Sequence, residues 1–289
     1  LIPDLRKLRK NYNFYNNPWR EPEFFKIQWI KIINNVIKDA SSKKKINNIL
    51  EVGCGTGFLS LELARVGNKV VGIDVSKKSI NEAKNYLKTI DKYRKLDLTY
   101  KVEDANKINY ENKFDVIIFY RSLHHFKNIN KLLKRVKNNL SSNGILIICE
   151  PLRKNFGRLN SLFSVILRLS LETWIDTEKK IPKNINLSFI KSKEKEIQKE
   201  YKYLSSKNSY AQSPMDNSTD SPEKVIKSIK NFFKIRKIEY YDGFVDKLIG
   251  GLRGKYKFKI AKLLKEFDNY LIKEKVIKGT TLYLVAKKK

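Results

Sequence analysis

The chain is poor in the residues that build disulfide frameworks and metal sites. Its 289 residues include two cysteines and two histidines. Cys54 and Cys149 both lie in apolar, strand-like stretches, so we expect no disulfide framework and no metal, and a reducing, cytoplasmic compartment. These absences exclude a disulfide-stapled fold and a cysteine-rich metal site. At this length the chain can instead bury a substantial apolar core.

Long apolar runs are missing as well. No stretch approaches the roughly 18 uninterrupted apolar residues that a membrane-spanning helix needs. The nearest, LNSLFSVILRLSL at 159–171, is interrupted by Arg168. It indicates a buried or lid helix, with a helix on a membrane surface as the alternative. The first ten residues, LIPDLRKLRK, lack the continuous apolar core of a signal peptide.

Acidic residues are scarce: 30 Asp and Glu stand against 61 Lys and Arg, which gives a formal net charge of +31. Such a charge would suit a polyanion such as RNA or an anionic membrane. The basic residues, however, are spread over the whole chain and form no single block, as a coding bias would produce. We therefore favour compositional bias, and nucleic acid and peripheral membrane contact stay open as less favoured partners.

Periodicity predicts a regular alternation of strands and helices up to residue 151. The expected strands are 48–52, 69–74, 96–104, 113–120 and 145–151, and the expected helices are 21–39, 58–66, 76–90 and 128–140. Because these strands are apolar and separated by helices, they should be buried on both faces of a parallel sheet with right-handed crossovers. This half is therefore predicted as a doubly wound, Rossmann-like α/β sheet.

The second half is less regular. A helix at 221–233 with a strand at 234–242, and a last strand at 279–289, would extend the sheet to seven strands. Two helical insertions are expected to act as lids over the ligand face. We expect a single domain, with amino-terminal lid helices at 1–40, a ligand-binding core at 41–151, lid insertions at 152–221 and 243–278, and the rest of the sheet at 222–242 and 279–289.

Three glycines follow the first predicted strand, in the stretch EVGCGTG at 51–57. A strand, a glycine turn and a helix bring bare backbone amides and a helix amino terminus to the carboxyl edge of the sheet. The spacing is G-x-G-x-G, and the bulky Phe58 stands where a dinucleotide-binding turn has a small residue. Glu51, two residues before the first glycine, would repel a pyrophosphate and attract an ammonium group. The turn therefore indicates a cationic ligand.

Together with four further stretches, this turn resembles the class I S-adenosylmethionine-dependent methyltransferases. The stretches follow in order between residues 47 and 151: ILEVGCGTGFLSLELA, VVGIDVS, VEDANKI, FDVIIFYRSLHHF and LLKRVKNNLSSNGILIICEP. The resemblance implies a seven-stranded sheet whose last strand is antiparallel. It also implies S-adenosylmethionine as the cofactor and transfer of its methyl group to an acceptor.

The resemblance assigns the cofactor's methionine part to the glycine turn. Gly53, Cys54, Gly55 and Gly57 would let the backbone approach it, and Glu51 would meet its amino group.

Further residues would bind the rest of the cofactor. Asp74, at the end of the second strand, would accept from both ribose hydroxyls, because a carboxylate has two oxygens at the right separation for a diol. Val75 would pack on the adenine, Asp104 would accept from the adenine amine, and Ala105 would lie close by. Tyr120 and Arg121, which end the fourth strand, would flank the methionine carboxylate or the reaction centre.

His124 and His125 directly follow the fourth strand, at the mouth of the expected site. Imidazole is the side chain best suited to accept a proton near neutral pH. Either histidine could be the catalytic base for a hydroxyl acceptor, with His125 slightly favoured and Tyr120 as a further candidate. A structural or gating role for the pair is an equal alternative.

Missing motifs narrow the acceptor. There is no D-P-P-Y or N-P-P-Y after the fourth strand, no Pro-Cys pair, no double-glutamate loop and no acidic metal cluster. Amino-methylation of nucleobases, cytosine C5 chemistry, arginine methylation and metal-dependent catechol chemistry are therefore disfavoured. What remains is a small, partly hydrophobic acceptor of the quinone, lipid or natural-product kind. A tRNA wobble-uridine carboxylate methyltransferase and an inactive cofactor-binding module are the alternatives left open.

Overall fold

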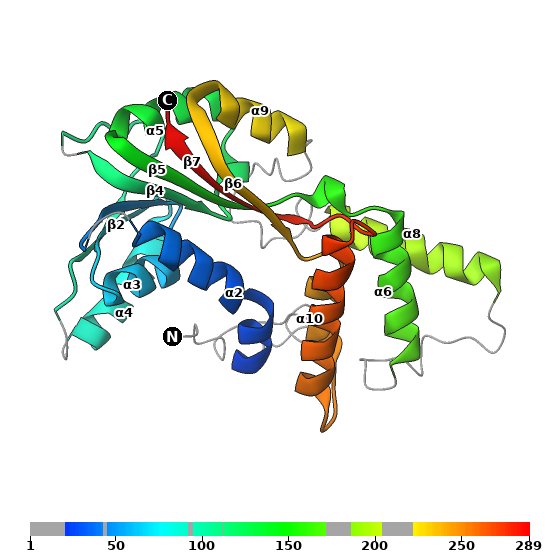
Figure 1. Cartoon of the computed structure of the whole chain (residues 1–289). Helices are drawn as coiled ribbons and strands as arrows, with labels where there is room; N and C mark the ends of the chain where they lie inside the picture. The colour runs from blue at the N-terminus through cyan, green and yellow to red at the C-terminus, as the bar shows by residue number, and fades with distance from the viewer. Residues whose placement is uncertain (1–20, 43–44, 92–94, 112, 172–185, 204–221) are drawn as a thin grey trace. The chain divides into compact units, whose positions relative to one another are not determined.

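The predicted alternation of strands and helices is present in the computed structural model of the chain (Figure 1). It describes residues 21–42, 45–91, 95–111, 113–171, 186–203 and 222–289. The strands are β1 (Asn48–Val52), β2 (Lys69–Asp74), β3 (Leu98–Val102), β4 (Phe114–Tyr120), β5 (Leu140–Pro151), β6 (Phe233–Tyr241) and β7 (Thr281–Lys288). The helices are α2 (Pro22–Ala40), α3 (Phe58–Arg65), α4 (Lys77–Asp91), α5 (Ile129–Asn139), α6 (Arg158–Ser170), α8 (Leu187–Tyr203), α9 (Pro222–Phe232) and α10 (Lys257–Lys273).

The described strands form one seven-stranded sheet in the order β3-β2-β1-β4-β5-β7-β6. β1 pairs in parallel with β2 and with β4, and parallel pairing continues to β3 on one side and to β5 on the other. The last strand is antiparallel, so the predicted sheet is confirmed. Because the strand order reverses between β1 and β4, their carboxyl ends border the crevice in which such sheets bind ligands.

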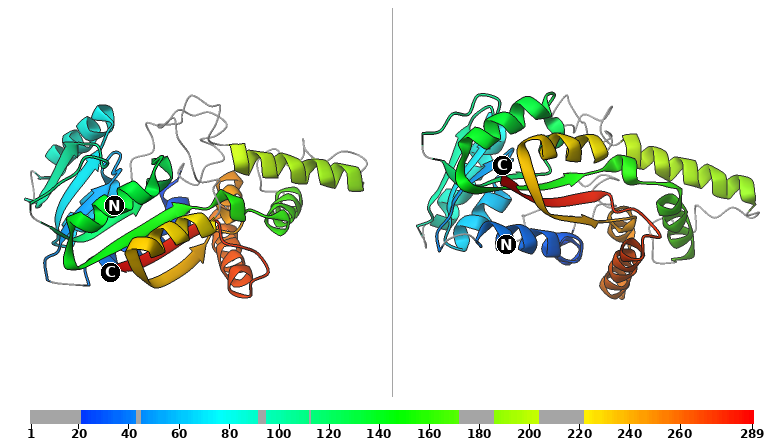
Figure 2. Two further views of the ribbon diagram at one scale, coloured as in Figure 1. Left: turned by 90° about the horizontal axis from the view of Figure 1, so that it is seen from above. Right: turned by 45° about the horizontal axis from the view of Figure 1, so that its top comes forward.

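Helices cover both faces of this sheet, as the apolar strands require. α3, α4 and residues 32–40 of α2 lie on one face, and α5 and α9 lie on the other (Figure 2). α5 shows how the sequence directs this packing. Asn128 caps its first turn, and Leu132, Leu133 and Val136 form a buried stripe at helical spacing.

The start of β5 differs from the prediction. The stretch SSNG, 141–144, separates the helix predicted at 128–140 from the strand predicted at 145–151 and is typical of a turn, but β5 already begins at Leu140 and runs through it. Phe114 of β4 pairs with Leu140, whereas Val116 pairs with Ile145, so β5 carries extra residues between the two pairs. The turn-forming residues are thus accommodated by an irregularity within the strand rather than by a break in it.

The described residues fall into two compact units. The core unit comprises those within 32–151, 213–239 and 282–289, and the insertion unit comprises those within 1–31, 152–212 and 240–281. The predicted lid residues 1–20, 172–185 and 204–221 lie outside the described part, and the single domain and the lid role stay predictions. No helix in the described part is long and apolar enough to cross a membrane.

The insertion unit has its own apolar core and a buried ion pair. Lys265 of α10 is 6% exposed, and its Nζ lies 2.5 Å from Oδ1 of Asp242. Asp268, one helical turn further on, accepts hydrogen bonds from the backbone N–H groups of Gly243 and Phe244. Burial raises the pKa of Asp268 to about 6. These contacts fix α10 to the segment that follows β6.

Candidate cofactor and acceptor site

The loop between β1 and α3 takes its shape from its glycines. Gly53, Gly55 and Gly57 have φ values of 72°, 54° and 80°, in the left-handed region that favours glycine. The N–H groups of Gly53 and Cys54 both donate to the carbonyl of Ile73, at 2.8 and 3.0 Å, which ties the loop to the end of β2. The predicted turn therefore lies at the carboxyl edge of the sheet.

Close neighbours also exclude larger residues from two of these positions. A Cβ at Gly53 would lie 2.5 Å from the Cβ of Ser122, and a Cβ at Gly57 would overlap the Tyr100 ring and hydroxyl. Tyr100 is held in place because its hydroxyl donates to the Gly57 carbonyl at 2.7 Å. A Cβ at Gly55, by contrast, would meet no atom within 4 Å. Gly55 therefore stands at the open part of the loop.

Asp74 is fixed against this loop. Its Oδ2 accepts from the N–H of Gly55 at 2.9 Å, and its Oδ1 accepts from the N–H of Ser76 at 2.8 Å. Each carboxylate oxygen keeps a further acceptor position, so the pair can still accept from a diol. Val75 beside it is 70% exposed and leaves its side chain open to a planar ring. The two residues thus lie where a nucleoside could bind.

Glu51, near the end of β1, is buried, whereas Asp74 is partly exposed. Glu51 is 3% exposed, and its Oε2 accepts a hydrogen bond from the Ser60 hydroxyl on α3. Burial raises the pKa of Glu51 to about 7, and the Asp74 charge adds to the rise. A cationic group that approached Glu51 would favour its ionised form.

Asp104 follows β3 on the same edge of the sheet. Its Oδ1 accepts from the backbone N–H and the side-chain amide of Asn106, each at 2.9 Å. Oδ2 accepts no hydrogen bond from the described residues and is available to an amine donor. Ala105 is buried, at 3% exposed, so its side chain is not open to a ligand.

The end of β4 turns sharply. Tyr120 is half-buried at the last position of the strand, and Arg121 has a φ of 56°, which is uncommon for a residue with a side chain. The Arg121 N–H donates to the Cys149 carbonyl on β5 at 2.7 Å, which secures the turn. Ser122 then donates from its hydroxyl to the Val52 carbonyl at 2.6 Å, at the end of β1 and directly before the glycine loop.

Glu150, near the end of β5, organises the segment after this turn, although the sequence alone predicted no role for it. Its Oε1 accepts from the N–H groups of Ser122 and Leu123, at 2.8 and 2.7 Å. Its Oε2 lies 2.6 Å from Nδ1 of His124. The one available signal was an acid inside the otherwise apolar stretch ILIICEP, since a buried carboxylate requires hydrogen-bond donors.

The two histidines lie together but have different surroundings. Their ring centroids are 3.9 Å apart, with the planes tilted by 46°. His124 is the one joined to Glu150, and its side chain is 10% exposed. The catalytic role that the sequence suggested for one of them, or for Tyr120, stays a prediction.

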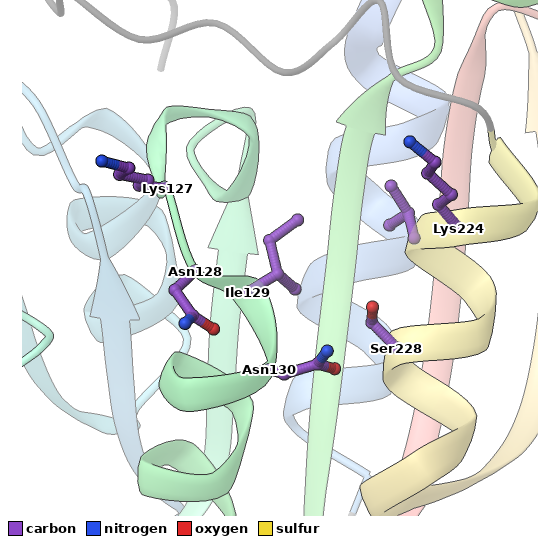
Figure 3. A pocket seen from close by; sticks show the side chains of 7 residues that line it. Lys127, Asn128, Ile129, Asn130, Lys224 and Ser228 are labelled. Carbon is purple, nitrogen blue, oxygen red and sulfur yellow. The ribbon is translucent and has the colours of Figure 1, made fainter.

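Two further features bear on the limits of the site. The described residues contain no group of three or more His, Cys, Asp or Glu side chains that could hold a metal ion. A polar cavity of about 230 Å³ opens elsewhere, between the start of α5 and α9, where Asn130 and Ser228 lie across from each other (Figure 3). It contains none of the predicted site residues, so it does not enlarge the candidate site.

Comparison with known proteins gives a match to one family model and to several relatives. The family model, described as a methyltransferase domain, matches residues 43–208. A ubiquinone biosynthesis O-methyltransferase of Pelagibacter ubique is 39% identical over 147 residues, which cover 49% of this chain and 55% of the relative. A malonyl-[acyl-carrier protein] O-methyltransferase of Bacillus cereus is 25% identical over 131 residues, 45% of this chain and 46% of the relative. The chain thus spans about half the length of the curated relatives it matches.

Solved structures support the fold. A protein of Pyrococcus horikoshii has a TM-score of 0.52 at 18% identity, covering 96% of each chain. A SAM-dependent methyltransferase of Aquifex aeolicus has a TM-score of 0.51 at 14% identity, covering 93% of this chain and 94% of its own.

Proposed function

Because this chain belongs to the methyltransferase-domain family, among the class I S-adenosylmethionine-dependent enzymes, we propose that it methylates an oxygen atom of a small, partly hydrophobic acceptor. The predictions of the family and of S-adenosylmethionine as the cofactor are confirmed. The observation that carries the proposal is the Asp74 carboxylate, held by the Gly55 and Ser76 amides beside a loop whose glycines leave room for a ligand.

The residues at this edge fit the cofactor's chemistry. Asp74 would hold the ribose diol, Asp104 the adenine amine, and Glu51 the amino group. The bound cofactor supplies a methyl group attached to a sulfonium sulfur. The neutral thioether that departs is a good leaving group. The chain's own task is to hold the acceptor in line with that methyl group and to keep water out, since alignment and desolvation supply much of the acceleration.

The nature of the acceptor is supported more indirectly. The two relatives from Pelagibacter ubique and Bacillus cereus are O-methyltransferases, one in ubiquinone biosynthesis and one acting on malonyl-[acyl-carrier protein], which favours oxygen as the methylated atom. These relatives give no support to the tRNA alternative.

Calorimetry and product analysis test the proposal. We expect the purified chain to bind S-adenosylmethionine and S-adenosylhomocysteine but not NAD. In a panel of small phenols, alcohols and carboxylic acids, mass spectrometry should then detect an acceptor that gains one methyl group. Absence of binding by either cofactor form would overturn the proposal.

A proton should leave Glu51 when the cofactor binds. Since the pKa of Glu51 is raised to about 7, the carboxyl is about half protonated at pH 7, and a cationic amino group would drive the proton off. Affinity for S-adenosylhomocysteine should therefore rise between about pH 6 and 8. Calorimetry in two buffers of different ionisation enthalpy measures the protons released on binding. At pH 7 the unaltered chain should release about half a proton more than Glu51→Gln does. Equal release by both proteins would remove Glu51 from the amino-group site.

A further inference from the structure

The contacts of Glu150 determine which nitrogen of His124 carries a proton. Glu150 is 3% exposed, and its Oε1 accepts from two backbone N–H groups, so this oxygen serves as an acceptor only. With Glu150 as the carboxylate, the short 2.6 Å contact between Oε2 and Nδ1 of His124 is a donation from the imidazole N–H. In a neutral imidazole this leaves the lone pair on Nε2.

Nε2 is thus the nitrogen of His124 that can accept a proton. Among the described residues none makes a hydrogen bond with Nε2 of His124, although the side chain is only 10% exposed. The backbone that carries His124 is fixed by the same carboxylate, through the amides of Ser122 and Leu123. Ser122 in turn donates to the carbonyl of Val52, the residue directly before the glycine loop. One buried acid therefore contacts both the imidazole and the backbone amides that precede it.

We propose that His124 accepts the proton of the acceptor's hydroxyl group and that Glu150 is the positioning residue that keeps Nε2 free for it. This inference rests on the proposed function and makes its substrate class more specific. The hydroxyl proton passes to Nε2 while the oxygen bonds to the methyl carbon. The bond between that carbon and sulfur breaks, and sulfur keeps the electron pair. The resulting imidazolium keeps its hydrogen bond from Nδ1 to the Glu150 carboxyl group.

This arrangement selects among oxygen acceptors. A carboxylic acid has a pKa near 4 and is ionised at neutral pH, so its methylation needs no base. A phenol has a pKa near 10 and is almost fully protonated, so a base placed at the hydroxyl increases the rate. The acceptor is therefore a phenol or an alcohol rather than a carboxylate. The geometry points to His124 as the base, where the sequence slightly favoured His125.

The tautomer itself can be measured without any acceptor. In protein labelled with ¹⁵N at histidine and saturated with S-adenosylhomocysteine, NMR should find the proton of His124 on Nδ1. Glu150→Gln keeps the size of the side chain, but its amide can donate to Nδ1, so the proton should move to Nε2. Glu62→Gln, which removes an ion pair with Arg65 on α3, serves as the matched control and should change neither the tautomer nor turnover. A His124 proton on Nε2 in the unaltered protein would overturn the proposal.

Turnover gives the second test. With phenols whose pKa values span about 7 to 10, we expect His124→Asn and Glu150→Gln to lower kcat by about a hundredfold to ten-thousandfold, with little change in KM. The loss should shrink for the most acidic phenols, which are already ionised. Methylation of carboxylic acids but of no phenol, or a loss of turnover in His125→Asn but not in His124→Asn, would overturn the proposal.

Affinity for S-adenosylhomocysteine distinguishes a failure of the proposed function from a failure of the roles of His124 and Glu150. If the unaltered chain does not bind it, the proposed function fails. If the unaltered chain and both variants bind it alike, the variants are folded. Unchanged turnover by them would then overturn only the roles of His124 and Glu150.

Discussion

Replacement of Asp74 by alanine is expected to weaken S-adenosylhomocysteine binding by about 2 to 4 kcal/mol, or about 30- to 1000-fold. Two losses combine in this variant. The ribose diol loses a charged acceptor, and the amides of Gly55 and Ser76 lose the carboxylate that fixes the loop. The effect should exceed that of Asp104→Ala, because the described hydrogen bonds of the Asp104 side chain are both with its near neighbour Asn106.

Isothermal calorimetry measures this loss of affinity. Two further variants show whether the loss is specific to the Asp74 carboxylate. Asp74→Asn keeps one carbonyl oxygen but replaces the other with a donor, so it should fall between the alanine variant and the unaltered chain. Asp39→Asn is the matched control, since Asp39 accepts from the Tyr283 hydroxyl at 2.6 Å, away from the loop. It should leave affinity unchanged. Equal affinities for Asp74→Ala and the unaltered chain would remove Asp74 from the ribose site.

The parts of the fold and site that local sequence could predict are those encoded by neighbouring residues. β1 begins and ends at the predicted residues, 48 and 52, because an apolar run stands between polar residues and a glycine turn. Asp74 was identifiable because it ends a strand next to that turn in the sheet. The class of sheet likewise follows from strands that are apolar on both faces.

The parts that escaped prediction depend on contacts between distant residues. Glu150 meets the amides of Ser122 and Leu123 only because β4 and β5 pair in one register, and no nearby residue signals this. Lys265 resembles the many exposed lysines of a chain with 61 Lys and Arg, yet it is buried against Asp242. In so basic a sequence, one lysine with a buried partner cannot be distinguished by composition or by helical spacing.

Gly57→Ala should cause a large loss of folding stability. Its φ of 80° costs an L-residue about 1 to 2 kcal/mol, and the added Cβ would overlap Tyr100, which adds about 1 to 3 kcal/mol of overpacking. Tyr100 cannot readily move aside, because its hydroxyl is bonded to the Gly57 carbonyl. Denaturant unfolding followed by circular dichroism should therefore find the free energy of unfolding lower by about 2 to 5 kcal/mol.

Gly67→Ala isolates the steric part of this effect. Gly67 has a φ of 94°, but a Cβ there would meet no atom within 4 Å, and the residue lies beyond α3, away from the candidate site. Its replacement should therefore cost only the backbone strain, about 1 to 2 kcal/mol, and leave S-adenosylhomocysteine affinity unchanged. Gly57→Ala should lose both stability and affinity, since Tyr100 and the loop must shift together. Equal losses of stability in the two variants would show that the Tyr100 ring yields to the added Cβ and does not fix the loop.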